Sequence, residues 1–404
     1  GLKIEGLRAQ DLKPLSQRIS SAISPMTGEK RAEEIRRGII EYMKALETLS
    51  EHKKGGEPEI EAELTVSDKK LAIGLIEEAE AAARRALDIA ARVEAGDALR
   101  ARVLYKLART LGYRKENHKE AEAHYKEAIS LAERARDAFA LATAWSGLGA
   151  LAWRVGDHKR ALDNYKKALR LLSALTPVSK GEKTRLDNTM ANIHSGLGNV
   201  YLDLVKMEES IAHQERALAI YKDLEDWGQV GRAYNNLARV YEEMGRYPEA
   251  IDRYERGVQY TRRGKASRME GWTLTNLASA LADAGMVDRA RAPLERAERL
   301  LADFSDPIAH SKLHCMWGKY HRAKKEWDKG IERFRRSIEV IADENAPDYL
   351  ATAQEEFGML YYQKGEGERA AEQLSAALHW WRRAVNEPKV EKIEKLLKAL
   401  KKKG

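Results

Sequence analysis

The sequence has little that would cross-link, break or anchor the chain. Among 404 residues there is one cysteine, Cys315, and there are only nine prolines. A single cysteine cannot close an internal disulfide, and it fits a reducing compartment, so the cytoplasm is the expected location. No apolar run approaches the roughly 20 residues that a membrane-spanning helix needs. No basic start followed by an apolar stretch marks a signal peptide. We therefore expect no membrane insertion.

Signatures of catalysis are also lacking. The closest match to a phosphate-binding loop, Gly365-Glu366-Gly367, is not followed by Gly-Lys-Ser/Thr, and no Gly-x-Ser-x-Gly elbow occurs. His310 and His314 stand one helical turn apart near Cys315 and His321, which raises the possibility of a metal site. The repeat described below places His314 and His321 where other copies carry Tyr or Leu, which favours packing. We expect no catalytic residues, no metal and no cofactor, and hence no enzyme.

The charge does not demand a nucleic-acid partner. The formal net charge is +8, but seven lysines against three glutamates from Glu387 onward supply +4 of it. The remaining chain is almost balanced, so binding of nucleic acid is the least favoured function. Ala, Leu, Glu, Lys and Arg dominate, and 43% of residues are hydrophobic, which predicts an all-α protein.

A pattern with a step of 40 residues runs through most of the chain. A small residue, preceded by Leu or an aromatic residue, recurs at 198, 238, 278, 318 and 358. A bulky residue follows three positions later in most copies, and two further small residues flank a bulky one later in each copy. Small residues let two antiparallel helices approach closely, and large ones fill the space between successive pairs. Glycines that should turn the chain with positive φ after the first helix are Gly156, Gly245, Gly285 and Gly365.

The fullest copy of the pattern consists of Trp145, Leu148, Gly149, Gly156, Ala161, Tyr165 and Ala168. It resembles the tetratricopeptide repeat, a helical hairpin marked by Trp-x-x-Leu-Gly-x-x-Tyr and then Ala, Phe and Ala. The longer step of 40 is similar to the subclass found in kinesin light chains, Leu-Gly-Asn-repeat polarity adaptors and bacterial signalling regulators. Leu197-Gly198-Asn199 matches the triplet of the polarity adaptors. The resemblance implies a right-handed superhelical solenoid of about eight hairpins that holds a protein or peptide partner.

The repeats predict three regions. Residues 1–27 form an N-terminal helical extension, residues 28–385 the solenoid, and residues 386–404 a basic C-terminal helix. The first hairpin is expected to pair a helix over 32–49 with one that carries Ala79, Ala83 and Ala86, and about nine residues are inserted near 176–188. The last helix is expected to cap the final repeat, since solenoids need covered ends. The alternative is a basic amphipathic helix that docks on an acidic surface or a membrane.

In this family the first helix of each hairpin lines the inner, concave wall, so the resemblance also assigns partner-binding positions. A carboxamide can donate to and accept from an extended backbone, and basic residues favour acidic side chains. The asparagines could instead cap turns or bond within the groove, and the tryptophan could belong to the core. The predicted binding residues are Asn192, Asn199, Asn235, Asn236, Arg239, Trp272, Asn276, Lys312, Lys319 and Arg322.

Two functions follow from the resemblance. The first is a scaffold or adaptor that binds an extended, acidic segment of a partner in the concave groove. The second is a peptide-sensing regulatory module that controls an attached or separate effector in signalling or transcription. The identity of the partner is not contained in the sequence.

Overall fold

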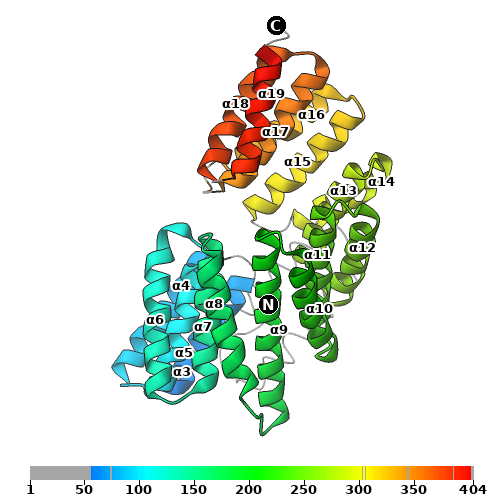
Figure 1. The fold of residues 1–404 in the computed structure, drawn as a ribbon. Coiled ribbons are helices and arrows are strands. Elements are labelled where there is room, and N and C mark those ends of the chain that lie inside the picture. Colours follow the sequence, from blue (N-terminus) through cyan, green and yellow to red (C-terminus); the bar gives the residue numbers. More distant parts are fainter. Residues whose placement is uncertain are drawn as a thin grey trace, which may run out of the picture. The chain divides into compact units, whose positions relative to one another are not determined.

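The structure is a computed structural model that describes residues 56–72, 75–302, 304, 306–342, 344, 346–384 and 386–401. Within these residues all regular structure is helical, with 17 α-helices, one short 3-10 helix and no strand (Figure 1). The predicted all-α helical-repeat solenoid is therefore confirmed. The predicted extension over 1–27 and the helix over 32–49 lie outside the described residues. None of the described helices combines the length and the apolar character needed to cross a bilayer.

The described residues fall into two compact units, with the boundary between Leu204 and Val205. Unit 1 contains three helical hairpins, in which consecutive helices pack against each other, followed by a single long helix. Its helices are α3 (Glu57–Ala72), α4 (Ile76–Arg92), α5 (Asp97–Leu111), α6 (His118–Arg134), α7 (Ala138–Arg154), α8 (His158–Ser173) and α9 (Lys180–Asp203), with the 3-10 helix η2 (Lys115–Asn117) after α5.

Unit 2 begins with one helix, continues with four hairpins and ends with a last helix that packs on α18. Its helices are α10 (Met207–Asp223), α11 (Trp227–Glu243), α12 (Tyr247–Arg263), α13 (Ser267–Asp283), α14 (Val287–Leu301), α15 (Pro307–Ala323), α16 (Trp327–Val340), α17 (Pro347–Lys364), α18 (Gly367–Arg383) and α19 (Glu387–Lys401).

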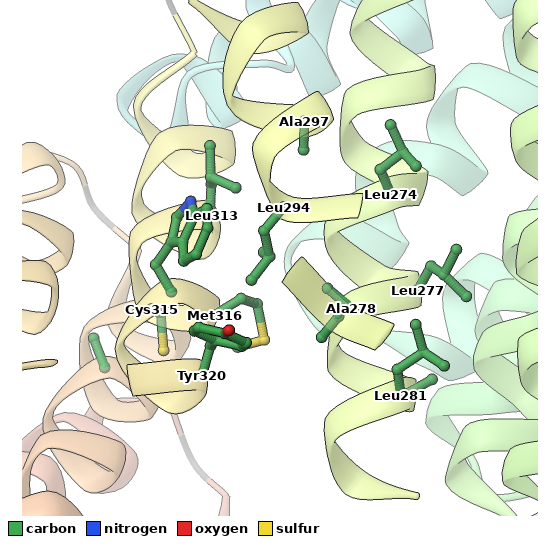
Figure 2. Packing of buried hydrophobic residues seen from close by; sticks show 14 of the residues in the cluster. Leu274, Leu277, Ala278, Leu281, Leu294, Ala297, Leu313, Cys315, Met316 and Tyr320 are labelled. Carbon is green, nitrogen blue, oxygen red and sulfur yellow. The ribbon is translucent and has the colours of Figure 1, made fainter. Parts of the chain in front are cut away.

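The small residues of the repeat mark the closest approach of the two helices of a hairpin. A Cβ atom added to Gly318 of α15 would lie 2.7 Å from the Phe334 ring of α16, and one added to Gly149 would lie 3.1 Å from the Tyr165 ring. In the α13–α14 hairpin the same position is Ala278, and the facing Leu294 lies between α13 and α15 (Figure 2). The repeat thus alternates small and large residues across each pair, as close packing requires.

The turn after the first helix adopts a left-handed conformation in most of the described copies. The predicted glycines have φ between 71° and 88°. Lys325 holds the same turn without glycine at φ 58°, whereas Gly112 after α5 has φ −64°. Side chains with a Cβ are strained in the left-handed region, so the packing of α15 against α16 stabilises this geometry at Lys325.

The first hairpin differs from the sequence prediction. Ala79, Ala83 and Ala86 are buried on α4 as expected, and among the described residues α4 pairs with α3, which the sequence did not predict. Ile60 and Leu64 of α3 belong to the same apolar cluster as Ala86. The short connection between Ala72 and Ile76 makes α3 the local partner, and its weak amphipathic pattern concealed it.

The inserted residues near 176–188 lengthen α9. This helix has 24 residues, against 14 to 18 in the other α-helices. It starts after Ser179, whose side chain accepts a hydrogen bond from the backbone N–H of Glu182 at 3.1 Å, a standard N-terminal cap. Leu186, within the insertion, is buried in the apolar cluster that also contains Tyr165 and Leu172.

Candidate partner-binding face

The first helices of the unit 2 hairpins, α11, α13, α15 and α17, contact one another in order along the chain. They carry most of the binding residues predicted from the sequence. We use the name A-helix face of unit 2 for a set of charged residues and one tryptophan on these four helices. Its members are Arg239, Glu242, Trp272, Asp283, Lys312, Lys319, Arg322 and Glu356.

The asparagines of this region are buried. Asn235, Asn236 and Asn276 are 4%, 8% and 1% exposed. Asn276 Nδ2 donates to Asn235 Oδ1 at 2.8 Å, and Asn236 Nδ2 lies 3.4 Å from Gln214 Oε1 of α10. The predicted contact with a peptide backbone would need exposed carboxamides. In the structure these amides bond to other side chains, because buried amides must find partners.

Two of the predicted basic residues are neutralised within the fold. Lys319 Nζ lies 2.9 Å from Asp283 Oδ1, and Arg322 Nη1 lies 2.6 Å from Glu356 Oε2. Glu356 also lies 4.0 Å from Lys319, so the four groups form a chain of alternating charge across α13, α15 and α17. This arrangement leaves Lys319 and Arg322 with little attraction for an external anion.

Arg239 and Lys312 are different. Both are half-buried, and the ion pairs of the described residues include neither of them. Lys312 Nζ lies over the Trp272 ring, 5.4 Å from its centroid, which is a cation–π contact. Burial lowers the pKa of Lys312 to about 8. Trp272 is partly buried against the apolar cluster, so it serves both as a core residue and as the support of Lys312.

Glu242 completes the face from the end of α11. Its Oε2 accepts a hydrogen bond of 2.6 Å from the Tyr254 hydroxyl of α12. Burial raises the pKa of Glu242, while the charges of Lys312 and Lys319 act in the opposite direction. Arg239 in turn acts on Tyr349 of α17, whose pKa is raised by burial.

The remaining predicted residues lie in unit 1. Asn192 of α9 is exposed, and its Nδ2 donates to Asn188 Oδ1 at 3.0 Å. Asn199, on the same helix, is half-buried. The predicted site from Asn192 to Arg322 is thus divided between the two units.

The histidines and the cysteine behave as packing residues. His321 stacks on the Trp317 ring at 5.5 Å, and Arg333 Nη1 lies 3.2 Å from His314 Nδ1. Burial raises the pKa of Cys315 to about 12. Within the part of the chain that the structure describes, no three His, Cys, Asp or Glu side chains converge as metal ligands would.

Sequence reasoning missed Glu356 and Tyr254. Glu356 has a signal in the repeat, because it stands 40 residues after Met316, 80 after Asn276 and 120 after Asn236. Tyr254 occupies the bulky position of the second helix in the repeat pattern, and nothing in the sequence shows that its hydroxyl reaches Glu242.

The comparisons with known proteins agree with the repeat. The family profile described as tetratricopeptide repeat matches residues 70–134, 99–174 and 189–263. The resemblance inferred from the sequence is therefore confirmed, and the chain contains tetratricopeptide repeats. This supports the coarse prediction of a protein-interaction scaffold. No curated protein matches the sequence.

Three solved structures share the fold. Aspartyl phosphate phosphatase F from Bacillus subtilis has a TM-score of 0.59 at 13% identity over 94% of this chain and 96% of that one. The apo form of RapI has 0.57 at 13% over 94% and 99%. A Rap protein complexed with Competence and Sporulation Factor has 0.54 at 14% over 86% and 99%. At these identities the likeness concerns the fold alone.

Proposed function

We propose that the chain is a scaffold or adaptor that binds an extended segment of a partner protein on the A-helix face of unit 2. The observation that carries the proposal is that side chains of successive first helices meet on this face. Lys319 of α15 lies 2.9 Å from Asp283 of α13 and 4.0 Å from Glu356 of α17, and Lys312 of α15 lies over the Trp272 ring of α13 at 5.4 Å. A segment lying along this face could contact several repeats at once, which is how repeat arrays present extended binding surfaces.

Acidic residues are the expected complement of this face, because Arg239 and Lys312 bring positive charge that the fold does not pair. The asparagines Asn235 and Asn276 have a structural role in this proposal, since they bond to each other.

The test is a co-purification of partner proteins from the cells that express the chain. The full chain is used in three forms, which are wild type and two variants. Ser279 lies half-buried on α13 with its hydroxyl 3.5 Å from Asp283 Oδ2, a member of the A-helix face, so Ser279→Trp would obstruct the face. Arg299→Trp on the exposed side of α14 is the matched control. We expect wild type and Arg299→Trp to retain the same partners and Ser279→Trp to lose them. Equal recovery by all three forms would contradict the proposal, provided that their circular dichroism spectra agree.

A second function, a regulatory module that senses a peptide, is favoured by the fold shared with the Rap protein solved with Competence and Sporulation Factor. It predicts a large change in shape when a ligand binds. Small-angle scattering of the full chain, measured with and without a partner segment recovered in the co-purification, separates the two functions. A decrease in radius of gyration supports the sensor, and an unchanged radius supports the adaptor.

We further propose that the chain acts without catalysis and in the cytoplasm. The thiol of Cys315, with its pKa of about 12, is a poor nucleophile at neutral pH. His314, with its pKa lowered to about 4 by burial, is poorly matched to proton transfer near pH 7. The absence of catalysis is checked by incubating the full chain with acetyl phosphate, an acyl phosphate. Release of phosphate above the uncatalysed rate would contradict it.

A further inference from the structure

We propose that a cavity of unit 2, between α16 and the α17–α18 hairpin, binds a phosphate monoester. The cavity has a volume of about 430 Å³, which is within the range of small-ligand sites. The cations that line it are Arg335, Arg336, Lys364 and Arg369. None of its lining residues belongs to the A-helix face, so this site is separate from the one in the proposed function.

The charge of Arg335 departs from the repeat. With the step of 40 residues, the positions of Arg335 and Arg369 are held two copies earlier by Glu255 and Arg289. Glu255 Oε1 of α12 lies 3.1 Å from Arg289 Nη2 of α14, so these two positions form an ion pair between successive second helices. The repeat can therefore bring the two side chains into contact.

The copy between these two also has opposite charges at the same positions, with Glu295 on α14 and Lys329 on α16. In the copy formed by α16 and α18 a guanidinium replaces the carboxylate, and both arginines line the cavity. The neighbouring Arg336 pairs with Glu332 at 2.8 Å, whereas Arg335 has no ion pair among the residues that the structure describes. An anion in the cavity would take the place of the missing carboxylate and offset the repulsion between the two cations.

The other two cations are held in place by a single carboxylate. Lys364 Nζ lies 2.7 Å from Glu366 Oε1, and Arg369 Nη1 lies 2.8 Å from Glu366 Oε2. Glu366 is not among the residues that line the cavity, so it positions these cations without filling the space. The Arg369 guanidinium also lies over the Tyr361 ring, 5.7 Å from its centroid. A guanidinium that is already oriented loses less conformational entropy when a ligand binds.

The charges around the cavity set the class of ligand. The four cations stand against Asp328 and Glu332, which leaves a surplus of two positive charges, or of one when Glu366 is included. A phosphate monoester carries about −1.5 to −2 at pH 7, and its oxygens accept paired hydrogen bonds from guanidinium groups. Ile331 and Tyr361 also line the cavity, and they offer an apolar wall to the carbon group that carries the phosphate.

The test is a titration of phenyl phosphate with the full chain at low salt, followed by phosphorus NMR. We expect saturable binding by wild type and about tenfold weaker binding by Arg335→Glu, because the introduced carboxylate would pair with Arg369 in place of the ligand. Arg299→Glu makes the same change of charge at an exposed position of α14 that does not line the cavity. This matched control should bind phenyl phosphate as wild type does.

Stability separates loss of the site from loss of the fold. Arg335→Glu restores the charge pattern of the earlier copies, so its thermal midpoint without ligand should equal or exceed that of wild type. If this variant does not fold, Arg335→Gln and Arg369→Gln serve in its place, since each removes one cation and adds no charge. Each should weaken the binding of phenyl phosphate relative to Arg299→Glu.

Three further ligands define the chemistry and its source. Benzoate has the same ring and one negative charge, and it should bind about tenfold more weakly than phenyl phosphate. Inorganic phosphate should also bind more weakly, because it has no group to contact Ile331 and Tyr361. A nonapeptide with a central phosphotyrosine completes the set. If the peptide binds more tightly than phenyl phosphate, the phosphate belongs to a partner side chain, and if it does not, the ligand is a free phosphate ester.

Three results would overturn the inference. The first is the absence of saturable binding of phenyl phosphate by wild type. The second is equal binding by wild type and a folded Arg335 variant, which would show that this arginine is not part of a site. The third is benzoate binding as tight as that of phenyl phosphate, which would show that the cavity does not select phosphate. All three leave the proposed function standing, because its test uses the A-helix face.

Discussion

Asn276 Nδ2 of α13 donates a hydrogen bond of 2.8 Å to Asn235 Oδ1 of α11, and both carboxamides are buried. The bond joins two successive first helices of the repeat array. At the position of Asn235 the next copies carry Thr275, Cys315 and Glu355, so the bond is specific to this pair of repeats. The pair therefore stabilises the stacking of repeats, a role distinct from the partner contact predicted from the sequence.

The first prediction concerns this pair. Asn235→Ala leaves Asn276 Nδ2 buried without its acceptor, and should lower the free energy of unfolding by about 1–3 kcal/mol. Urea denaturation followed by circular dichroism measures the loss. The double variant Asn235→Leu/Asn276→Leu removes both polar groups and should recover most of it. If Asn235→Ala is as stable as wild type, the amide pair has no structural role.

The second prediction uses two glycines of unit 2. Gly318→Ala places a methyl group 2.7 Å from the Phe334 ring, so it should destabilise by about 1–3 kcal/mol through overpacking. Gly367 starts α18, and an added Cβ there meets nothing within 4 Å. Gly367→Ala should therefore be neutral, or stabilising by up to about 1 kcal/mol. The two thermal midpoints, compared with that of wild type, check this, and similar shifts in both variants would argue against the close approach of α15 and α16.

The third prediction concerns acid stability. Burial, reinforced by the charge of Arg333, lowers the pKa of His314 to about 4, against about 6.5 in the unfolded chain. Between pH 6.5 and pH 4 the unfolded state binds a proton that the folded state does not. The stabilisation that comes from keeping His314 neutral in the folded state is therefore lost as the pH falls through that window. The free energy of unfolding decreases by about 3 kcal/mol at most.

Urea denaturation of wild type and His314→Gln at pH 7, 5.5 and 4.5 measures this term. The stability of the variant relative to wild type should rise as the solution is acidified. His379→Gln, on the exposed side of α18, is the control and should track wild type. A constant difference between wild type and His314→Gln across the three pH values would rule out the linkage.

The fourth prediction concerns α19. Ile393 is fully buried in the cluster with Leu374, Ala377 and Trp381, and Lys392 Nζ lies 2.8 Å from the buried Glu355. Ile393→Ala should cost about 2–5 kcal/mol and speed hydrogen exchange in α17 and α18. Lys398→Ala, in a neighbouring turn of α19, is the control and should leave hydrogen exchange in α17 and α18 as in wild type. Unchanged protection of α17 and α18 in Ile393→Ala would mean that α19 does not cap the last hairpin.

The helical hairpins follow directly from the sequence because their determinants are local and repeated. The step of 40 placed Ala238, Ala278 and Gly318 at the contact between paired helices, and the structure buries all three. The turn glycines had positive φ as expected. Lys325 adopts that conformation without glycine, which the packing of α15 against α16 stabilises.

What the sequence determined by itself is the class of fold and the positions that repeat, since period and residue size are visible in it. What the tertiary structure decided is which polar residues are already satisfied. Lys319 meets Asp283 from 36 residues earlier, and Arg322 meets Glu356 from 34 residues later. Arg239 and Lys312 look the same in the sequence and have no such partner among the residues that the structure describes. Charge pairing across neighbouring repeats depends on helix rotation and side-chain reach, and these are fixed only when the helices pack.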